Sequence, residues 1–237
     1  MEIRSRCIAL KEVKYKDSRA IATTMAREIG RISFAVSDSQ SKDSRRRRAL
    51  MQPGSIFESL IDFRENRQLQ TFRDISPALP AAALDPARQQ VALFVADFLY
   101  CFLNDESSDP LLFDYVEDFL RQLALSRRSI ASAPLAFVMG LLSIIGIAPD
   151  SSTYRPGYVF DMNDGIFRPV ALHRNRTLSI EESALLPRLL RMRLRNSHLF
   201  VASRVDRNRR LDLALDYIAI HFPHFRAPRS LAILRTL

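Results

Sequence analysis

The sequence has few of the residues from which common catalytic and metal-binding sites are built. Its six glycines are widely spaced, so no glycine-rich loop is available to wrap around a phosphate group. Its two cysteines, Cys7 and Cys101, lie far apart in apolar stretches. This predicts two buried thiols in a reducing compartment and excludes a zinc cluster made of cysteine alone. These absences argue against an enzyme, and we expect neither a cofactor nor a metal ion.

The four histidines add only a weak signal. His221 and His224 are three positions apart and could share a metal ion, but no carboxylate or thiolate lies close to them in the sequence. Two surface histidines at the end of a helix are the simpler interpretation. The segment Asp161–Gly165 has part of the pattern of a calcium-binding loop. Its spacing is one residue short and the distal glutamate is missing, which favours a turn.

Long apolar runs are missing as well. The most apolar stretch, Pro134–Pro149, is shorter than the roughly 20 residues that a membrane-spanning helix needs. The amino-terminal residues lack the long apolar centre of a signal peptide. From these absences we expect a cytoplasmic protein that is not inserted in a membrane.

Arginine, in contrast, is abundant and unevenly distributed. Residues 1–78 hold 16 lysines and arginines against 10 aspartates and glutamates, residues 79–150 hold 4 against 9, and residues 151–237 hold 15 against 7. The net charge of +9 is therefore arranged as a basic, an acidic and a basic region. Of the 35 cations 31 are arginine, whose planar guanidinium group binds phosphate oxygens with two hydrogen bonds and stacks on flat rings. This pattern predicts a polyanionic partner, and nucleic acid is the leading candidate.

Residues 1–78 predict a β domain. Five segments mix β-branched and apolar residues with polar ones, and turn residues separate them. These segments are Arg6–Val13, Ala20–Arg27, Ile32–Val36, Ser55–Phe63 and Leu69–Ile75. Five short strands with one long connection in the middle are typical of the small closed barrel of the oligonucleotide-binding (OB) fold.

Residues 79–237 predict a helical domain, so the chain as a whole is expected to have an α+β fold. The joint between the domains is expected at Ser76–Ala83, which contains two prolines and several alanines. Helices are predicted after Asp85-Pro86 and Asp109-Pro110, from Pro134 to Gly146, after the capping box Ser179–Glu182, and over the apolar stripe Leu211–Phe222. The third of these is apolar on nearly all sides, which predicts a central position among the helices. A short hairpin is expected around Asn163–Gly165.

The strongest local candidate for a nucleic-acid contact is the middle connection of the barrel. Residues Ser37–Arg48 contain no apolar side chain, and their cations are Lys42, Arg45, Arg46, Arg47 and Arg48. We expect a flexible loop that binds phosphates whatever the base sequence. The alternative is a solvated loop that only favours solubility. Some of the cations on or beside the strands are expected to extend the same surface, and these cations are Lys11, Lys14, Lys16, Arg19, Arg27 and Arg31. Lys14, Lys16, Arg19 and Arg31 are taken as the candidate contacts.

Two further arginine clusters lie in the helical part, at 188–195 and 204–210. On helices they could follow a phosphate backbone, and Arg191, Arg195 and Arg209 are the candidates for such contacts. Alternatively, these arginines pair with carboxylates of the acidic middle region in the same molecule. The sequence leaves both interpretations open.

Several stretches, taken in order and with their spacing, resemble RecO, the family of bacterial recombination-mediator proteins of DNA repair. They are Leu10–Ser18, Arg27–Arg31, Ser37–Ser41, Leu111–Phe113 with Phe119-Leu120, Phe137–Leu142 with Gly146, and Arg229–Leu231. The resemblance covers nearly the whole chain. It implies an amino-terminal OB barrel, a helical carboxy-terminal domain and no bond-cleaving activity.

The resemblance also implies a set of partners. RecO proteins bind single- and double-stranded DNA and anneal complementary strands. They bind the protein RecR and the acidic, hydrophobic tail of the single-stranded-DNA-binding protein, and with these partners they load the recombinase RecA.

By position, the resemblance places Phe137 and Leu141 on a helix that helps to line the tail-binding pocket. Many family members have an arginine just before the equivalent of Phe137, whereas this chain has Leu135-Ala136. The cation that meets the acidic tail is therefore expected from Arg127, Arg128 or Arg229. Many members also carry a four-cysteine zinc module in the region that corresponds to residues 160–190. This chain has no cysteine there, so zinc is not expected.

The hypothesis is a DNA-binding recombination mediator that performs no chemistry itself. One alternative is an adaptor whose basic faces bind acidic protein tails without a direct role on DNA. Others are a nuclease built from dispersed carboxylates and a protein that attaches to anionic membrane surfaces.

Overall fold

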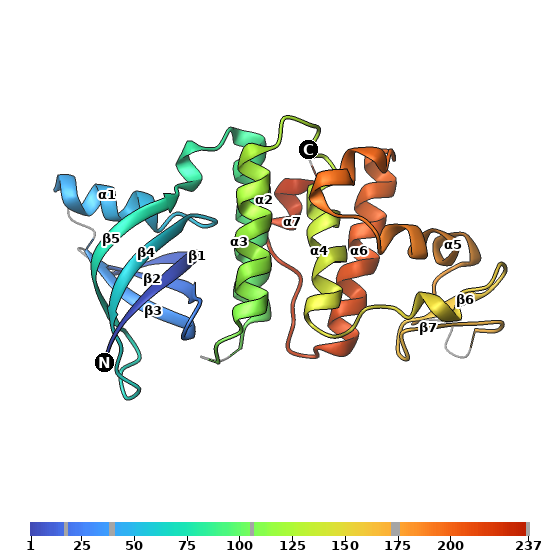
Figure 1. Cartoon of the computed structure of the whole chain (residues 1–237), viewed down its shortest axis with the longest axis horizontal. Helices are drawn as coiled ribbons and strands as arrows, with labels where there is room; N and C mark the ends of the chain where they lie inside the picture. The colour runs from blue at the N-terminus through green and yellow to red at the C-terminus, as the bar shows by residue number, and fades with distance from the viewer. Residues whose placement is uncertain (17–18, 38–40, 105–106, 172–175, 236–237) are drawn as a thin grey trace. The chain divides into compact units, whose positions relative to one another are not determined.

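The computed structural model describes residues 1–16, 19–37, 41–104, 107–171 and 176–235 (Figure 1). The chain folds into two compact units. The first, here called the sheet unit, contains residues 1–125 and 226–237, and the second, the helical unit, contains residues 126–225. The carboxy-terminal segment therefore belongs to the same unit as the amino terminus.

The sheet unit is built on a five-stranded antiparallel sheet with the strand order β3-β2-β1-β4-β5 (Figure 1). The strands are β1 (Glu2–Lys16), β2 (Arg19–Ala26), β3 (Gly30–Ser37), β4 (Ile56–Asp62) and β5 (Thr71–Leu79). The five predicted strands are confirmed. Strand β1 is longer than predicted. Its residues from Glu2 to Ile8 pair with β4, and its residues from Cys7 to Lys16 pair with β2.

The edges of this sheet approach each other at one point. Phe34 of β3 and Gln70 form a parallel bridge, and the backbone N–H of Gln70 donates to the carbonyl of Ser33 at 2.8 Å. The rings of Phe34 and Phe72 meet edge to face, with 5.1 Å between their centroids. The strand order and this contact confirm the OB-type fold. The full closure that a barrel implies is not reached, because in the described part of the chain β3 forms a single bridge with Gln70, just before β5, rather than a ladder with β5.

The interior of the sheet unit is apolar. Cys7, Phe34 and Phe57 are fully buried there. Burial raises the pKa of the Cys7 thiol far above its ordinary value, so this side chain stays protonated. The prediction of a buried thiol is confirmed for Cys7, whereas Cys101 is half-buried.

The connection between β3 and β4 corrects the sequence prediction. Residues Lys42–Leu50 form helix α1 rather than a flexible loop. Ser41 begins the helix by accepting a hydrogen bond from the backbone N–H of Ser44 at 3.2 Å. Arginine is a good helix former, and cations in the last turn interact favourably with the helix dipole. The lack of apolar residues suggested solvation, but helix propensity and the cap decide the local structure.

Three helices complete the sheet unit: α2 (Pro86–Phe102), α3 (Pro110–Leu125) and the short α7 (Leu231–Leu234). The predicted starts of the first two are confirmed. The carboxylate of Asp85 accepts from the backbone N–H of Arg88 at 3.0 Å, and that of Asp109 accepts from Leu112 at 2.9 Å. Because these helices pack in the same compact unit as the sheet, the expected joint at Ser76–Ala83 lies inside this unit.

The helical unit contains α4 (Ala133–Ile144), α5 (Ile180–Leu189), α6 (Arg204–His221) and a small hairpin of β6 (Val159–Asp161) and β7 (Ile166–Arg168). A short 3₁₀ helix, η4 (Leu194–Leu199), contacts α4. The central position of α4 is confirmed, because its residues from Ala133 to Leu142 are all buried. The capping box of α5 is confirmed as well, with Ser179 and Glu182 each bonded to the other's backbone N–H. Among the described helices, none has both the length and the apolar character that crossing a membrane requires.

Candidate nucleic-acid interface

Helix α1 has a buried side and a charged side. Ser44 and Met51, seven positions apart, are buried. Lys42, Arg45 and Arg47 are exposed, whereas Arg48 is partly buried and its Nε lies 3.7 Å from Oε1 of Glu12 on β1. The described cations of α1 therefore divide into three that face solvent and one that is held against the sheet. The side chain of Arg46 lies outside the described part of the structure.

The far end of the β1–β2 hairpin carries a second group of cations. In the strand register Lys14 lies opposite Ala20, and Lys16 lies opposite Arg19. The side chains of Lys14 and Arg19 are exposed, and that of Lys16 is outside the described part. Tyr15, between the two lysines, is 57% exposed. An accessible aromatic ring beside cations is the combination that binds a base and its phosphate together.

The sheet topology brings both groups to the same end of the sheet. Arg19 begins β2 and lies opposite Ser37, which ends β3, and α1 begins shortly after Ser37. The contact between Arg48 and Glu12 then holds α1 next to β1. We call the exposed cations at this place the basic end of the sheet unit, and they are Lys14, Arg19, Lys42, Arg45 and Arg47. Within the described part of the chain, none of these five side chains forms a salt bridge.

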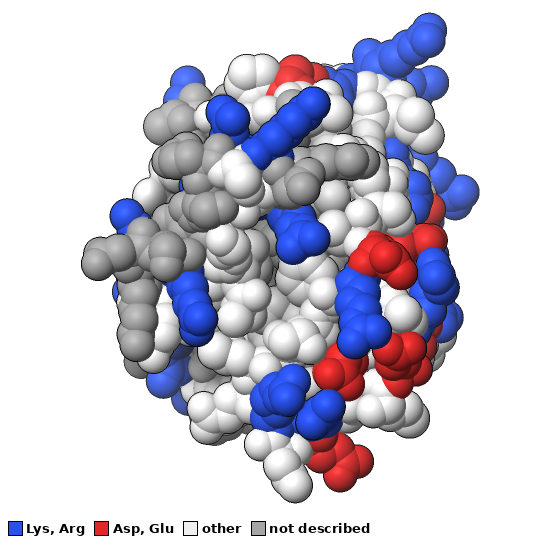
Figure 2. All heavy atoms as spheres, turned by 90° about the vertical axis from the view of Figure 1, so that its left-hand side faces the viewer, with Lys and Arg blue, Asp and Glu red and all other residues white. Residues whose placement is uncertain are grey.

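Figure 2 shows the side of the molecule on which the sheet and α1 lie. Lysine and arginine side chains are scattered over this side, within its outline as well as along it, and uncharged surface lies between them. Carboxylates gather towards one edge, where they alternate with cations. Cations separated by uncharged surface offer a flexible strand contacts for its phosphates and space for its bases.

Arg31, another predicted DNA contact, has a different environment. Its guanidinium group donates to the backbone carbonyls of Tyr100, at 3.3 Å, and Leu103, and it lies 4.6 Å from the centre of the Tyr100 ring. These carbonyls belong to the carboxy-terminal end of α2, where carbonyl groups lack partners within the helix. Arg31 therefore holds β3 to α2, a role that the sequence pattern did not reveal.

Two more cations of the sheet are paired with the acidic helix α3. Arg27 binds Asp114 with two hydrogen bonds of 2.7 and 2.8 Å, and Arg6 contacts both Asp114 and Glu117. The hydrogen bonds from Arg27 are the main reason why the pKa of Asp114 lies below its ordinary value. The acidic middle region thus does neutralise arginines of the same molecule. The partners are arginines of the sheet unit, Arg6 and Arg27, rather than those of the late clusters for which the sequence left this pairing open.

The late arginines belong to the helical unit and form no single group. Arg191 and Arg195 are exposed. The Nε of Arg209 lies 3.0 Å from Oε1 of Glu182, so this predicted DNA contact is paired inside the unit. Arg188 lies over the ring of Phe200, with 5.3 Å between its guanidinium carbon and the ring centre.

The residues predicted to bind an acidic protein tail do not form a pocket. Phe137 and Leu141 are fully buried in the helical unit, so they have no surface to offer a partner. Arg127 and Arg128 are exposed before α4, and Arg128 contacts the ring of His198. Arg229 is exposed and belongs to the sheet unit. Helix α4 is buried on all sides along its first ten residues, and the role of Phe137 and Leu141 at a tail-binding pocket stays a prediction.

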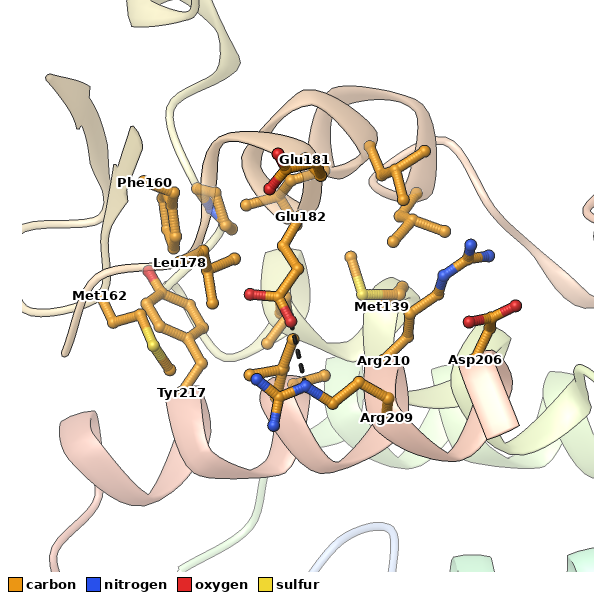
Figure 3. A pocket seen from close by; sticks show the side chains of 17 residues that line it. Met139, Phe160, Met162, Leu178, Glu181, Glu182, Asp206, Arg209, Arg210 and Tyr217 are labelled. Atoms are coloured by element: carbon orange, nitrogen blue, oxygen red, sulfur yellow. Dashed lines mark hydrogen bonds and ion pairs between the residues drawn. The ribbon is translucent and has the colours of Figure 1, made fainter. Parts of the chain in front are cut away.

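The helical unit instead contains a cavity of about 190 Å³ between α4, α5, α6 and the β6–β7 hairpin (Figure 3). Its lining is mainly apolar and includes Met139, Phe160, Leu186, Leu189 and Tyr217. Burial raises the pKa of the Tyr217 hydroxyl to about 12. That hydroxyl donates to the carbonyl of Ile147 at 2.9 Å.

Charged side chains stand at the same cavity. Glu182 points across it towards Arg209, with which it is paired (Figure 3). Arg210 also lines it and forms no salt bridge within the described residues. Glu181 and Asp206 line the cavity as well, so its charged groups are three carboxylates and two arginines around a mainly apolar lining. In the sequence, the part of this cavity that could be recognised was α5, with its capping box at Ser179–Glu182 and the leucines that follow it.

The hairpin next to this cavity is held by aromatic packing. The ring of Phe160 lies 5.1 Å from that of Phe167 and 5.5 Å from that of Tyr217, measured between centroids. The carboxylate of Asp161 accepts from the backbone N–H of Asn163 at 2.9 Å, which is the turn that the sequence predicted. His221 bonds the carbonyl of Met162 at 3.0 Å. Within the described residues, no three histidines, cysteines or carboxylates are grouped as metal ligands.

Comparison with known proteins covers almost all of the chain. Residues 1–80 match the model of the family described as recombination protein O N terminal, and residues 83–230 match that of recombination protein O C terminal. The chain is 34% identical over 232 residues to the DNA repair protein RecO of Phocaeicola vulgatus, which covers 97% of this chain and 96% of the relative. It is 32% identical over 244 residues to the protein of the same name from Porphyromonas gingivalis, which covers 100% and 99%.

Proposed function

The chain belongs to the RecO family of DNA repair proteins, and from this premise we propose that it binds single-stranded DNA with the basic end of its sheet unit. The family has a general role as a recombination mediator and is not a known family of enzymes. The observation that carries the proposal is the gathering of Lys14, Arg19, Lys42 and Arg45 at one end of an OB-type sheet. Cations that are already paired inside the protein cannot neutralise phosphates, and these four form no salt bridge among the described residues.

The proposed mechanism is electrostatic. Each phosphate contact releases counterions from the DNA, which drives binding and makes it depend on salt. A protein that neutralises the backbones of two strands lowers their mutual repulsion, so that complementary segments can pair. This account of annealing requires no catalytic residue. Double-stranded DNA offers the same phosphates and is expected to bind at the same end of the sheet.

The exposed arginines Arg191 and Arg195 are proposed as a separate set of phosphate contacts on the helical unit. Arg31 and Arg209 are not included, because their guanidinium groups are occupied within the protein. Lys16 and Arg46 stay candidates on the grounds of sequence position, whereas Arg48 is set aside with Arg31 and Arg209 because its guanidinium group lies against Glu12.

The partners are proposed from family membership. They are RecR, the acidic tail of the single-stranded-DNA-binding protein and, through these, RecA, with the cytoplasm as the place of action. For the tail we propose the cavity of the helical unit, because its apolar lining matches hydrophobic side chains and Arg210 forms no salt bridge among the described residues, although Glu181 and Asp206 stand at the same cavity. Arg127 and Arg128 are exposed in the same unit and can add charge.

This cavity also supports a second function, that of an adaptor for acidic protein tails without a direct role on DNA. Fluorescence anisotropy separates the two functions, with a labelled oligo-dT strand in one titration and a labelled acidic, hydrophobic peptide in the other. The mediator is expected to bind both, and its affinity for oligo-dT is expected to fall steeply with salt. Peptide binding without oligo-dT binding supports the adaptor and contradicts the proposed DNA function.

A further inference from the structure

Tyr15, near the end of β1, stands out among the aromatic residues because it faces solvent. It is 57% exposed, whereas every other aromatic residue in the described part of the chain is buried or half-buried. The sequence has 15 phenylalanines and 6 tyrosines, so the fold places nearly all of its rings in or against a core. Burial of such a ring is favourable. A single ring that is left accessible therefore marks the end of this hairpin as a candidate binding surface.

The local backbone explains why Tyr15 is accessible. Strand β4 pairs with β1 only as far as Ile8, so the end of the β1–β2 hairpin lies beyond β4. The strand register shifts between Lys14 and Lys16, which makes Tyr15 the additional residue of a β-bulge. A bulge changes the direction of a side chain, and bulges are common beside functional sites. Val13 is 49% exposed as well, so this part of the hairpin contributes little to the core.

The ring has cations of the basic end beside it. Lys14 precedes it in the strand, and Arg19 lies opposite Lys16 on the neighbouring strand. Lys14 and Arg19 are exposed, and neither forms a salt bridge within the described residues. The apolar surface here is limited to Tyr15 and Val13. A small apolar surface bordered by cations fits one base on a sugar–phosphate strand better than the wide apolar patch of a protein interface.

We propose that Tyr15 stacks on an unpaired base and thereby makes the basic end select single-stranded over double-stranded DNA. The phosphates are the same in both forms, so the cations alone give little selectivity. In a duplex each base is covered by its neighbours, and it must leave the stack before a side chain can lie on its face. The inference rests on the proposed DNA function, because the cations of the basic end must first hold the strand.

The test uses three labelled probes of equal length in fluorescence anisotropy titrations at one salt concentration. They are oligo-dT, the same strand with abasic sites, and a duplex whose ends are closed by non-nucleotide linkers. The wild-type protein is expected to bind oligo-dT about tenfold more tightly than the abasic strand, because stacking on one aromatic side chain contributes an effect of this size. Tyr15→Ala is expected to lose about tenfold in affinity for oligo-dT and less than about twofold for the other two probes.

Two control variants separate stacking from other effects. Tyr15→Phe keeps the ring and is expected to bind all three probes as the wild type does. Leu125→Ala removes an apolar side chain of α3 that is 81% exposed, and it is expected to leave all three affinities unchanged. The salt slope for oligo-dT is expected to be the same in Tyr15→Ala and in the wild type, because no phosphate contact is removed.

NMR of protein with ¹³C-labelled tyrosine gives a second readout. A base stacked on the ring is expected to shift the ring protons of Tyr15 upfield when oligo-dT is added, and the abasic strand is expected to leave them in place. The signal is assigned by its absence from the spectrum of Tyr15→Phe. A role of Tyr15 in hairpin structure alone would not make this shift depend on the presence of bases.

Three outcomes overturn the inference while the DNA function stands. They are equal affinity of Tyr15→Ala and the wild type for oligo-dT, a loss of the same size on the closed duplex, and a loss in Tyr15→Phe as large as that in Tyr15→Ala. If the wild-type protein does not bind oligo-dT at all, the proposed DNA function and this inference fail together.

Discussion

Arg27 and Asp114 face each other with two parallel hydrogen bonds, from Nε to Oδ1 at 2.7 Å and from the terminal nitrogen to Oδ2 at 2.8 Å. This pair joins the sheet to α3 and removes one arginine from the set that could meet DNA. Arg6 and Arg31 are engaged within the sheet unit in a similar way. The cations at the basic end, by contrast, have no carboxylate partner in the described part of the chain. The proposed function depends on this division between structural and accessible arginines.

The basic end predicts a salt dependence that can be measured directly. With about six phosphate contacts, the plot of log K against log salt for single-stranded DNA has a slope near −4, at about −0.7 per contact. The triple variant Lys42→Ala/Arg45→Ala/Arg47→Ala is expected to flatten this slope by about 2. Fluorescence anisotropy with oligo-dT at several salt concentrations measures it.

The control for this experiment is a variant with the same change in net charge. Arg155→Ala/Arg176→Ala/Arg204→Ala removes three exposed arginines of the helical unit and is expected to change the slope by less than the α1 variant does. If both variants change the slope equally, net charge rather than the basic end explains binding.

Arg31 is expected to contribute to stability rather than to DNA binding. Arg31→Ala removes hydrogen bonds to two carbonyls at the end of α2 and the contact with Tyr100. The expected loss in the free energy of unfolding is about 1–3 kcal/mol, measured by urea denaturation. The salt slope for oligo-dT is expected to stay unchanged. A flatter slope without loss of stability would return Arg31 to the DNA-binding surface.

The pKa of Asp114 predicts part of the pH dependence of folding. Because its pKa is lower in the folded protein than its ordinary value of 3.8, the unfolded chain takes up a proton at higher pH than the folded chain does. The stabilisation that the ionised Asp114 contributes to the folded protein is therefore complete above about pH 5, and it is lost as the pH falls through and below 4. Asp114→Asn is expected to lower stability at pH 7 and to make stability less sensitive to pH between 5 and 3. Equal pH dependence of the two proteins in urea titrations would show that other carboxylates dominate.

Gly54 is expected to tolerate no side chain. Its φ is +84°, and an added Cβ would lie 2.7 Å from Cβ of Ala92 on α2. Gly54→Ala is therefore expected to cost about 2–4 kcal/mol, from the left-handed backbone and from overpacking together. Gly157 has a similar φ of +85° but open space around it, so Gly157→Ala is the matched control with an expected cost of about 1 kcal/mol. Urea denaturation of both variants checks the difference, and equal losses would mean that packing against Ala92 is unimportant.

The cavity of the helical unit predicts how an acidic tail binds. Arg210→Gln is expected to weaken binding of an acidic, hydrophobic peptide by about fivefold, because the variant loses a cation of the cavity lining that forms no salt bridge among the described residues. Arg226→Gln in the sheet unit carries the same change in charge and is expected to leave the affinity unchanged. Anisotropy of the labelled peptide measures both variants. A loss of similar size in the two would place the peptide elsewhere on the protein.

Local patterns in the sequence predicted most of the secondary structure. Asp85, Asp109 and Ser179 each begin a helix because a short side chain can reach the free N–H groups of the first turn. The continuous apolar stretch at α4 predicted its burial. The run at Arg45–Arg48 was misinterpreted because charge was taken as a sign of a loop, although arginine favours helices.

The sequence by itself determined the family, the order of strands and helices, and the excess of arginine, because these depend on residues a few positions apart and on composition. Only the tertiary structure decided which arginines are available. Arg27 forms an ion pair because the fold places Asp114, 87 positions away in the sequence, next to it. No carboxylate of the described residues is placed in this way next to Arg45, which stays exposed. The cavity of the helical unit was decided at the same level, since its lining comes from segments far apart in the chain. Charge pairing and cavity formation depend on which distant segments lie close together in space. The periodicity of a single sequence gives no information about these distances.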